Sequence, residues 1–193
     1  MNNEDIIPGL EKLLFAEEGM RAYAILDGAS MPNLLGSLHT HEPEYVCLYR
    51  GELQPDMAEV APYLVWLNPD TDFPWWLASK GWGKHWGIVA QSRADLRTLR
   101  RHFRTFLIVY DETGKPMYFR WYDPRVLSVY LPTCDAAELA TLFGPVDAYV
   151  IETDDPTRVL RTRHATGGLK TERLSLLSST ESERRPSDAE NPR

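Results

Sequence analysis

The pattern of apolar and polar positions divides the chain into short helices and strands. Apolar residues recur at helical spacing between residues 6 and 14, whereas unbroken apolar runs at 22–26 and 62–67 are typical of strands covered on both faces. The same criteria predict further helices at 33–38, 72–78, 92–104, 126–131 and 135–143, and further strands at 45–49, 86–90, 105–110, 146–151 and 157–162.

The clearest hairpin of the chain joins the strand at 105–110 to a second strand that begins at Met117. The connecting segment, residues 111–116, contains Asp, Gly and Pro, which favour turns. A period of two along the second strand would place Met117, Phe119 and Trp121 on one face and Arg120 on the other. We therefore expect the strand to continue as far as residue 122.

A strand-to-helix corner follows this hairpin. Asp123 is a favoured helix cap and Pro124 is tolerated at the first helical position, so the pair ends the strand and begins a helix. Arg120, Asp123 and Arg125 then lie close together among large aromatic rings. Two interpretations remain open: an internal cluster of ion pairs and cation–π contacts, or an outward-pointing Arg125 that receives the carboxylate of a partner.

Strands and helices alternate, yet at least one strand pair is a hairpin. This combination predicts an α/β fold in the broad sense, or α+β, with a mixed, mainly antiparallel sheet and flanking helices. The 193 residues, 43 % of them hydrophobic, suffice for a single domain, which we place at residues 1–165. Residues 166–193 are rich in Gly, Ser, Glu, Arg and Pro, and we expect them to form a disordered tail.

The net charge, the cysteine content and the character of the first residues limit the cellular compartment and the classes of partner that we expect. The formal net charge of −7 argues against a general nucleic-acid or anionic-membrane binder. The acidic, amphipathic start is unlike a secretory signal, and no apolar run reaches the roughly 18 residues of a membrane span. Cys47 and Cys134 form no CxxC pair, so we expect buried thiols in a cytoplasmic protein.

Two surface features favour protein partners. Five of the six tryptophans lie between residues 66 and 86, too many indoles for one small core to hide completely. The predicted helix at 92–104 carries a stripe of arginines, which either pairs with acidic residues of the chain itself or docks an acidic protein. The candidate partner-binding residues are Trp75, Trp76, Trp82, Arg93, Arg97 and Arg101.

Motifs for catalysis or cofactor binding are weak. His39, His41 and Glu42 could present metal ligands from an extended segment, with His85 as a further donor, but the spacing matches no established zinc motif. The turn at 81–84 lacks the glycine spacing and the Ser/Thr of a P-loop, and no GxSxG elbow occurs. We therefore expect no metal and no cofactor.

An ordered set of motifs resembles a known family. The set comprises Tyr23-Ala-Ile-Leu-Asp-Gly-Ala29, Cys47-Leu-Tyr-Arg-Gly-Glu52, Ala61-Pro-Tyr-Leu-Val65, Gly81-Trp-Gly-Lys-His-Trp-Gly87, Leu96 to Arg104, Tyr118 to Leu127 and Leu142-Phe-Gly-Pro145. Together these motifs, spanning about residues 20–152, resemble the Tap/Tec-type adaptor chaperones of bacterial type VI secretion. Many members of that family continue into a longer C-terminal lobe, for which this chain has little sequence left.

This resemblance implies a non-enzymatic function. The chain would hold a toxic effector protein in the cytoplasm and load it onto its cognate VgrG spike protein before secretion. Two alternatives are an immunity protein that neutralises a toxin and a metal-dependent hydrolase that uses His39 and His41.

Overall fold

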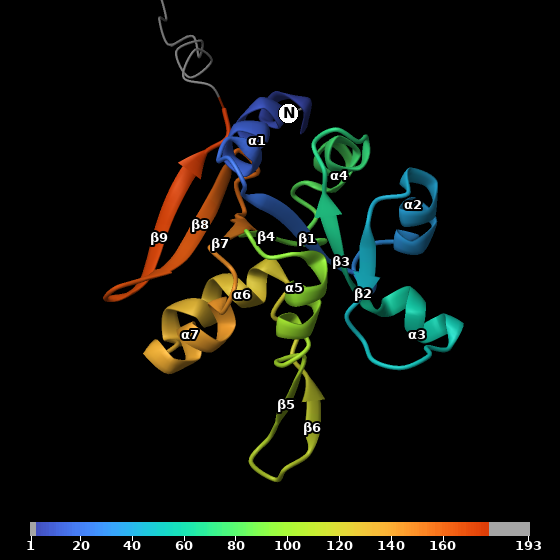
Figure 1. Ribbon diagram of the computed structural model, residues 1–193, viewed down its shortest axis with the longest axis vertical. Helices are drawn as coiled ribbons and strands as arrows, with labels where there is room; N and C mark the ends of the chain where they lie inside the picture. Colours follow the sequence, from blue (N-terminus) through green and yellow to red (C-terminus); the bar gives the residue numbers. More distant parts are fainter. Residues whose placement is uncertain (1–2, 178–193) are drawn as a thin grey trace, which may run out of the picture.

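A seven-stranded antiparallel sheet forms the centre of the computed structural model, which describes residues 3–177 (Figure 1). Its strand order is β2-β3-β1-β4-β7-β8-β9, and every neighbouring pair is antiparallel. The strands are β1 (Arg21–Asp27), β2 (Tyr45–Cys47), β3 (Pro62–Leu67), β4 (Gly87–Ser92), β7 (Ala148–Glu152), β8 (Arg158–Ala165) and β9 (Gly168–Ser175). The predicted α+β class with a mainly antiparallel sheet is confirmed.

Helices cover both faces of this sheet. One face packs against α1 (Ile7–Phe15), α2 (Leu34–His41) and α4 (Phe73–Gly81), and the other against α5 (Leu96–Phe103), α6 (Pro124–Tyr130) and α7 (Ala136–Phe143). Strand β1 runs between the two layers: Ala22, Ala24 and Leu26 belong to the first core, and Tyr23 and Ile25 to the second. Its unbroken apolar run therefore follows from burial on both sides.

Three further short elements lie outside the sheet and the two helix layers. They are α3 (Pro55–Val60), which has no buried residue, and two 3-10 turns at Asn3–Ile6 and Leu131–Thr133. The sequence pattern did not indicate α3, because a helix without a buried face leaves no apolar period. None of the helices in residues 3–177 is long and apolar enough to cross a bilayer.

The predicted hairpin exists but is shorter than expected. Strands β5 (Ile108–Tyr110) and β6 (Pro116–Tyr118) form a separate two-stranded ribbon that projects from the body beneath α5 (Figure 1). The strand ends at Tyr118 rather than continuing through residue 122, so Met117 and Trp121 do not share a face. Met117 is 46 % exposed, whereas Trp121 is fully buried against Phe103 and Phe106. Burial of the indole turns the chain into the core at this point.

The prediction of a disordered tail from residue 166 is wrong for the stretch that the structure describes. Strand β9 pairs along its whole length with β8, from Arg158 opposite Ser175 to Ala165 opposite Gly168. Its outward side chains are charged, as expected of an edge strand, and this polarity resembled that of a tail. Residues 178–193 lie outside the described part.

The start of α5 also differs from the prediction. The helix begins at Leu96 rather than at residue 92, and Asp95 is its N-cap, since the carboxylate of Asp95 accepts the N–H of Thr98 at 2.8 Å. Ser92 is the last residue of β4, where its buried hydroxyl donates to the carbonyl of Pro145. The helix is therefore shorter, and Arg93 precedes it.

Candidate partner-binding groove

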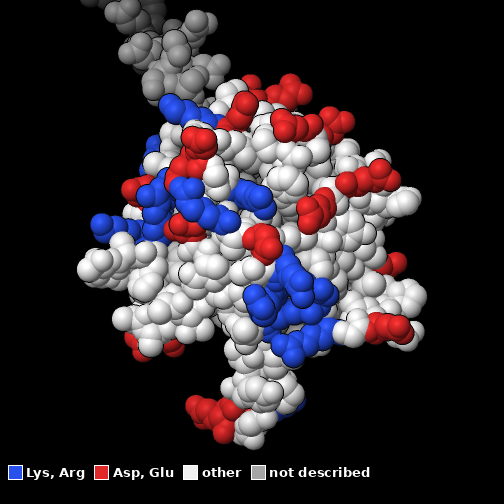
Figure 2. All heavy atoms as spheres, viewed as in Figure 1, with Lys and Arg blue, Asp and Glu red and all other residues white. Residues whose placement is uncertain are grey.

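Five arginines line a hollow beside α5. Arg97, Arg100 and Arg101 lie on the helix, Arg104 is its C-cap, and Arg50 lies in the loop after β2. Positions three, four and seven residues apart share one face of a helix, which explains why the α5 arginines gather while Leu99 and Phe103 face the core. Figure 2 shows them as a blue patch over α5, directly above the projecting hairpin. We call this feature the arginine hollow.

The arginine hollow has no acidic partner within the described chain. The ion pairs in residues 3–177 that involve arginine are those of Arg93, Arg120, Arg125 and Arg158, and none includes an arginine of the hollow. In addition, the buried Nε of Arg100 has no hydrogen-bond acceptor in this part of the chain. Within residues 3–177, pairing with acids of the chain itself is therefore found for Arg93 of the predicted stripe, which pairs with Glu17, but not for the arginines of the hollow.

Hydrogen bonds hold the guanidinium group of Arg104 in place at one side of the hollow. Its guanidinium donates to the carbonyl oxygens of Leu48 at 2.9 Å and Cys47 at 3.2 Å, and also to that of Tyr49. Burial lowers the pKa of Arg104 below its ordinary value, and the nearby positive charges of Arg100 and Arg50 lower it further. These three bonds fasten the end of α5 to the last residue of β2 and the two residues that follow it.

An apolar groove adjoins the arginine hollow and shares Arg50 and Arg104 with it. The groove has a volume of about 470 Å³ and runs between the hairpin and the segment that leads into α3. Its exposed lining includes Ile108, Tyr110 and Tyr118, which are 46 %, 70 % and 59 % exposed. Its other apolar lining residues are Leu48, Tyr49, Leu53, Met57 and Leu107.

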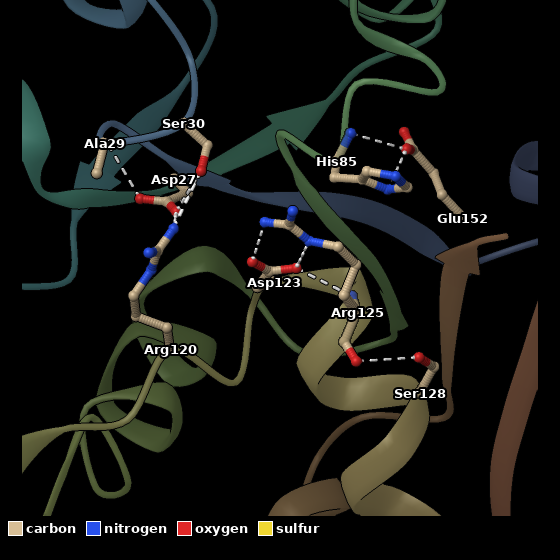
Figure 3. Close-up of polar contacts among 9 residues, drawn as sticks. All are labelled: Asp27, Ala29, Ser30, His85, Arg120, Asp123, Arg125, Ser128 and Glu152. Carbon is tan, nitrogen blue, oxygen red and sulfur yellow. Dashed lines mark hydrogen bonds and ion pairs between the residues drawn. The ribbon is translucent and has the colours of Figure 1, made fainter. Parts of the chain in front are cut away.

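Two contacts hold the hairpin in place beside the groove. Arg120, two residues beyond β6, forms an ion pair with Asp27 at the end of β1 and donates to the hydroxyl of Ser30 (Figure 3). The ring of Tyr118 also packs against that of Tyr49, with 5.1 Å between the ring centroids. The hairpin is therefore fastened to the central sheet at its base.

The predicted corner divides into two separate ion pairs. Asp123 caps α6 and binds the guanidinium of Arg125 through both carboxylate oxygens, at 3.0 and 2.7 Å, while Arg120 turns away to Asp27 (Figure 3). Burial alone would raise the pKa of Asp123, but the hydrogen bonds and charge of Arg125 outweigh it and lower the pKa below 3.8. Arg125 thus has an internal partner, as the ion-pair interpretation predicted, but Arg120 pairs with Asp27 and does not join the other two residues in one cluster.

The cation–π part of that prediction is also wrong. The cation–π contacts in the described chain are those of Arg21 over Trp66 and Lys84 over Trp86, away from this corner.

The three candidate tryptophans lie outside the groove, on the other face of the sheet. Trp76 stacks with Phe73 and packs against His41, and the indole N–H of Trp82 donates to the carbonyl of Pro156 at 2.9 Å. Trp75 donates to the carbonyl of Pro69 and packs edge-on against Phe15. All three are half-buried, so the structure does not bring the predicted tryptophans and arginines together.

Arg93 is likewise separate from the arginine hollow. Its guanidinium pairs with Glu17 and donates to the carbonyl of Glu18, which ties β4 to the end of α1. Of the predicted arginines, Arg97 and Arg101 lie in the hollow.

The histidines do not form the metal site that the alternative hypothesis of a hydrolase requires. His39 and His41 belong to the last turn of α2, not to an extended segment, so side chains two residues apart point in different directions. Within residues 3–177, no three His, Cys, Asp or Glu side chains are grouped closely enough to hold a metal ion. His85 lies beside Glu152 instead. The hypothesis of a metal site built on His39 and His41 therefore lacks the geometry it needs.

The apolar half of the groove was missed by the sequence analysis. One indication was available: Ile108 and Tyr110 alternate with Val109 on a strand that has only one neighbour. Met57 and Arg50 gave no indication, because they come close to the hairpin only through the fold.

The comparisons with known proteins give one match. The family model described as "Domain of unknown function (DUF4123)" matches residues 22–141, which include both α5 and the hairpin. Neither the search of curated proteins nor that of solved structures gives a match.

Proposed function

Because the chain belongs to the DUF4123 family, which is associated with type VI secretion effector adaptors, we propose that it is such an adaptor. It binds a toxic effector protein in the cytoplasm and loads it onto the cognate VgrG spike protein. In this function no substrate is converted. The chain recognises its partner proteins, and the secretion machine transports the effector.

The observation that supports this proposal is that the arginine hollow adjoins the exposed apolar groove and shares two lining residues with it. Arginine and tyrosine are enriched at protein interfaces, because each combines a large contact area with hydrogen bonding. Monomeric proteins rarely leave large apolar side chains gathered in the open without a partner. Here several such side chains flank arginines that have no acid of their own.

Co-purification tests the proposal directly. The tagged chain is expressed together with the neighbouring effector and VgrG genes, and the affinity eluate is passed over a size-exclusion column. We expect a stoichiometric complex with the effector, with VgrG, or with both. Elution of the chain alone in repeated experiments, although both partners are present in the lysate, contradicts the proposal.

A further inference from the structure

We propose that the groove binds an acidic segment of the partner protein, in which a large apolar side chain lies next to carboxylates. This inference rests on the proposed function and specifies the chemistry of the partner. The carboxylates bind at the arginine hollow, and the apolar side chain enters the groove between the hairpin and α3.

The charge of the hollow selects for acid. Arg97 and Arg101 are exposed and have no ion-pair partner in residues 3–177, so their guanidinium groups are free to bind carboxylates through two parallel hydrogen bonds. The chain as a whole carries a net charge of −7, so an acidic segment is repelled by most of the surface and attracted at this hollow. This contrast favours the hollow as the place where an acidic segment binds.

The apolar half selects for a large side chain. An isolated two-stranded ribbon is at best marginally stable, yet the hairpin exposes Ile108, Tyr110 and Tyr118 on the face that lines the groove. A volume of about 470 Å³ lies within the ~300–1,000 Å³ of typical small binding pockets and admits an aromatic or branched side chain. Burial of these residues by a partner stabilises both the hairpin and the complex.

The arginine hollow and the apolar groove are joined, which determines how far apart the carboxylates and the apolar side chain of the partner lie. Arg50 and Arg104 line both the hollow and the groove, so the apolar side chain and the carboxylates come from neighbouring positions of one segment. A nucleic acid fits less well, since its extended phosphate backbone needs a broad basic surface, which a chain of net charge −7 with five arginines gathered in one hollow does not offer.

Photo-crosslinking within the co-purified complex tests this inference. A benzophenone amino acid replaces Tyr110 in the groove or, as a control, Val129 on α6, which has the same exposed fraction of 70 %. We expect the groove position alone to crosslink, and the captured partner peptide to contain Asp or Glu next to an aromatic or branched side chain. A complex that forms without a crosslink from position 110, or a crosslink to a basic or neutral peptide, overturns the inference while the proposed function stands. Failure of the complex to form overturns both.

The affinity of a peptide with the crosslinked sequence, measured by fluorescence anisotropy, then tests the apolar groove and the arginine hollow separately. Ile108→Ala should weaken binding about tenfold by removing an apolar contact, whereas Val129→Ala should leave it unchanged. A rise from about 0.1 M to about 1 M salt shortens the Debye length from ~10 to ~3 Å and should also weaken binding at least tenfold. Affinity that is independent of salt, or a single-stranded oligonucleotide that binds with the same dependence on Ile108, contradicts the inference.

Discussion

At the scale of single residues, Glu152 is the clearest departure from ordinary titration. It ends β7 with its side chain only 8 % exposed, and its carboxylate accepts the backbone N–H of His85 at 3.1 Å (Figure 3). Burial raises the pKa of Glu152 from 4.5 to about 7, although this hydrogen bond opposes the shift. His85 adopts a φ of 55°, which is uncommon for a residue other than glycine, at the position where its N–H reaches the carboxylate.

This shift predicts a pH-dependent stability. Because the pKa of Glu152 is higher in the folded state than the ordinary 4.5, the folded state binds the proton more tightly. The resulting stabilisation is fully present below pH 4.5 and is lost as the pH rises through about 7; it amounts to roughly 3 kcal/mol. The Gln side chain of Glu152→Gln stays neutral at every pH, so this variant should lose the dependence. Between about pH 5 and about pH 8, its free energy of unfolding should therefore rise relative to that of the wild type.

Urea unfolding at both pH values measures the effect, with Glu172→Gln as the control, because Glu172 is exposed on β9. Parallel pH profiles for the wild type and Glu152→Gln would contradict the assignment.

Sequence reasoning at this scale succeeded where the partner is local. Asp123 was correctly predicted to cap a helix, because its partner, the N–H of Arg125, lies two positions away. The ion pair of Arg120 was not predictable, since Asp27 lies 93 positions earlier and only the fold brings the two together. The same holds for the bonds from Arg104 to the carbonyls after β2.

At the scale of elements, the hairpin is a small unit that depends on its attachment. Its two strands pair only with each other, and the bond from the N–H of Phe119 to the carbonyl of Leu107, at 2.9 Å, closes its base. The ion pair between Arg120 and Asp27 then fastens this base to β1. The position of the groove therefore depends on this ion pair as well as on the packing of Tyr118 against Tyr49.

Loss of this contact should loosen the hairpin selectively. Arg120→Ala leaves the buried Asp27 without its cation, so we expect about tenfold faster hydrogen exchange at the amides of β5 and β6, with less change in β1. Hydrogen exchange followed by mass spectrometry measures these exchange rates directly. The matched control is Arg125→Ala, which removes an ion pair confined to the start of α6 and should leave exchange in the hairpin unchanged. Equal exchange in both variants would show that the hairpin does not depend on Arg120.

The elements also show why part of the site was misplaced. The sequence indicated an arginine stripe and a group of tryptophans, and both exist, but on opposite faces of the sheet. Sequence spacing gives the face of a helix, whereas the layer to which that helix belongs follows from the strand order, in which β1 lies between β3 and β4. That order depends on long-range pairing, which a local pattern does not contain.

At the scale of the whole molecule, a chain of net charge −7 has an arginine hollow that is without an ion-pair partner in residues 3–177 and lies beside an open apolar groove. The α+β class and the hairpin were predictable, because they follow from local periodicity. The order of seven strands and the final strand β9 were not, since a charged edge strand and a polar tail have the same composition. Among the arginines of the hollow, Arg97 and Arg101 are exposed and donate no hydrogen bond to another part of residues 3–177.

The central claim is that this chain acts by binding a partner protein through the arginine hollow, and the affinity of the purified effector for a double variant tests it most directly. Arg97→Glu combined with Arg101→Glu puts carboxylates in place of two of the five arginines of the hollow and so cancels most of its positive charge, while Arg173→Glu reverses the charge of one exposed side chain on β9. We predict that the double variant loses capture, that Arg173→Glu retains it, and that both unfold within about 0.5 kcal/mol of the wild type. Wild-type affinity in the folded double variant would contradict the account.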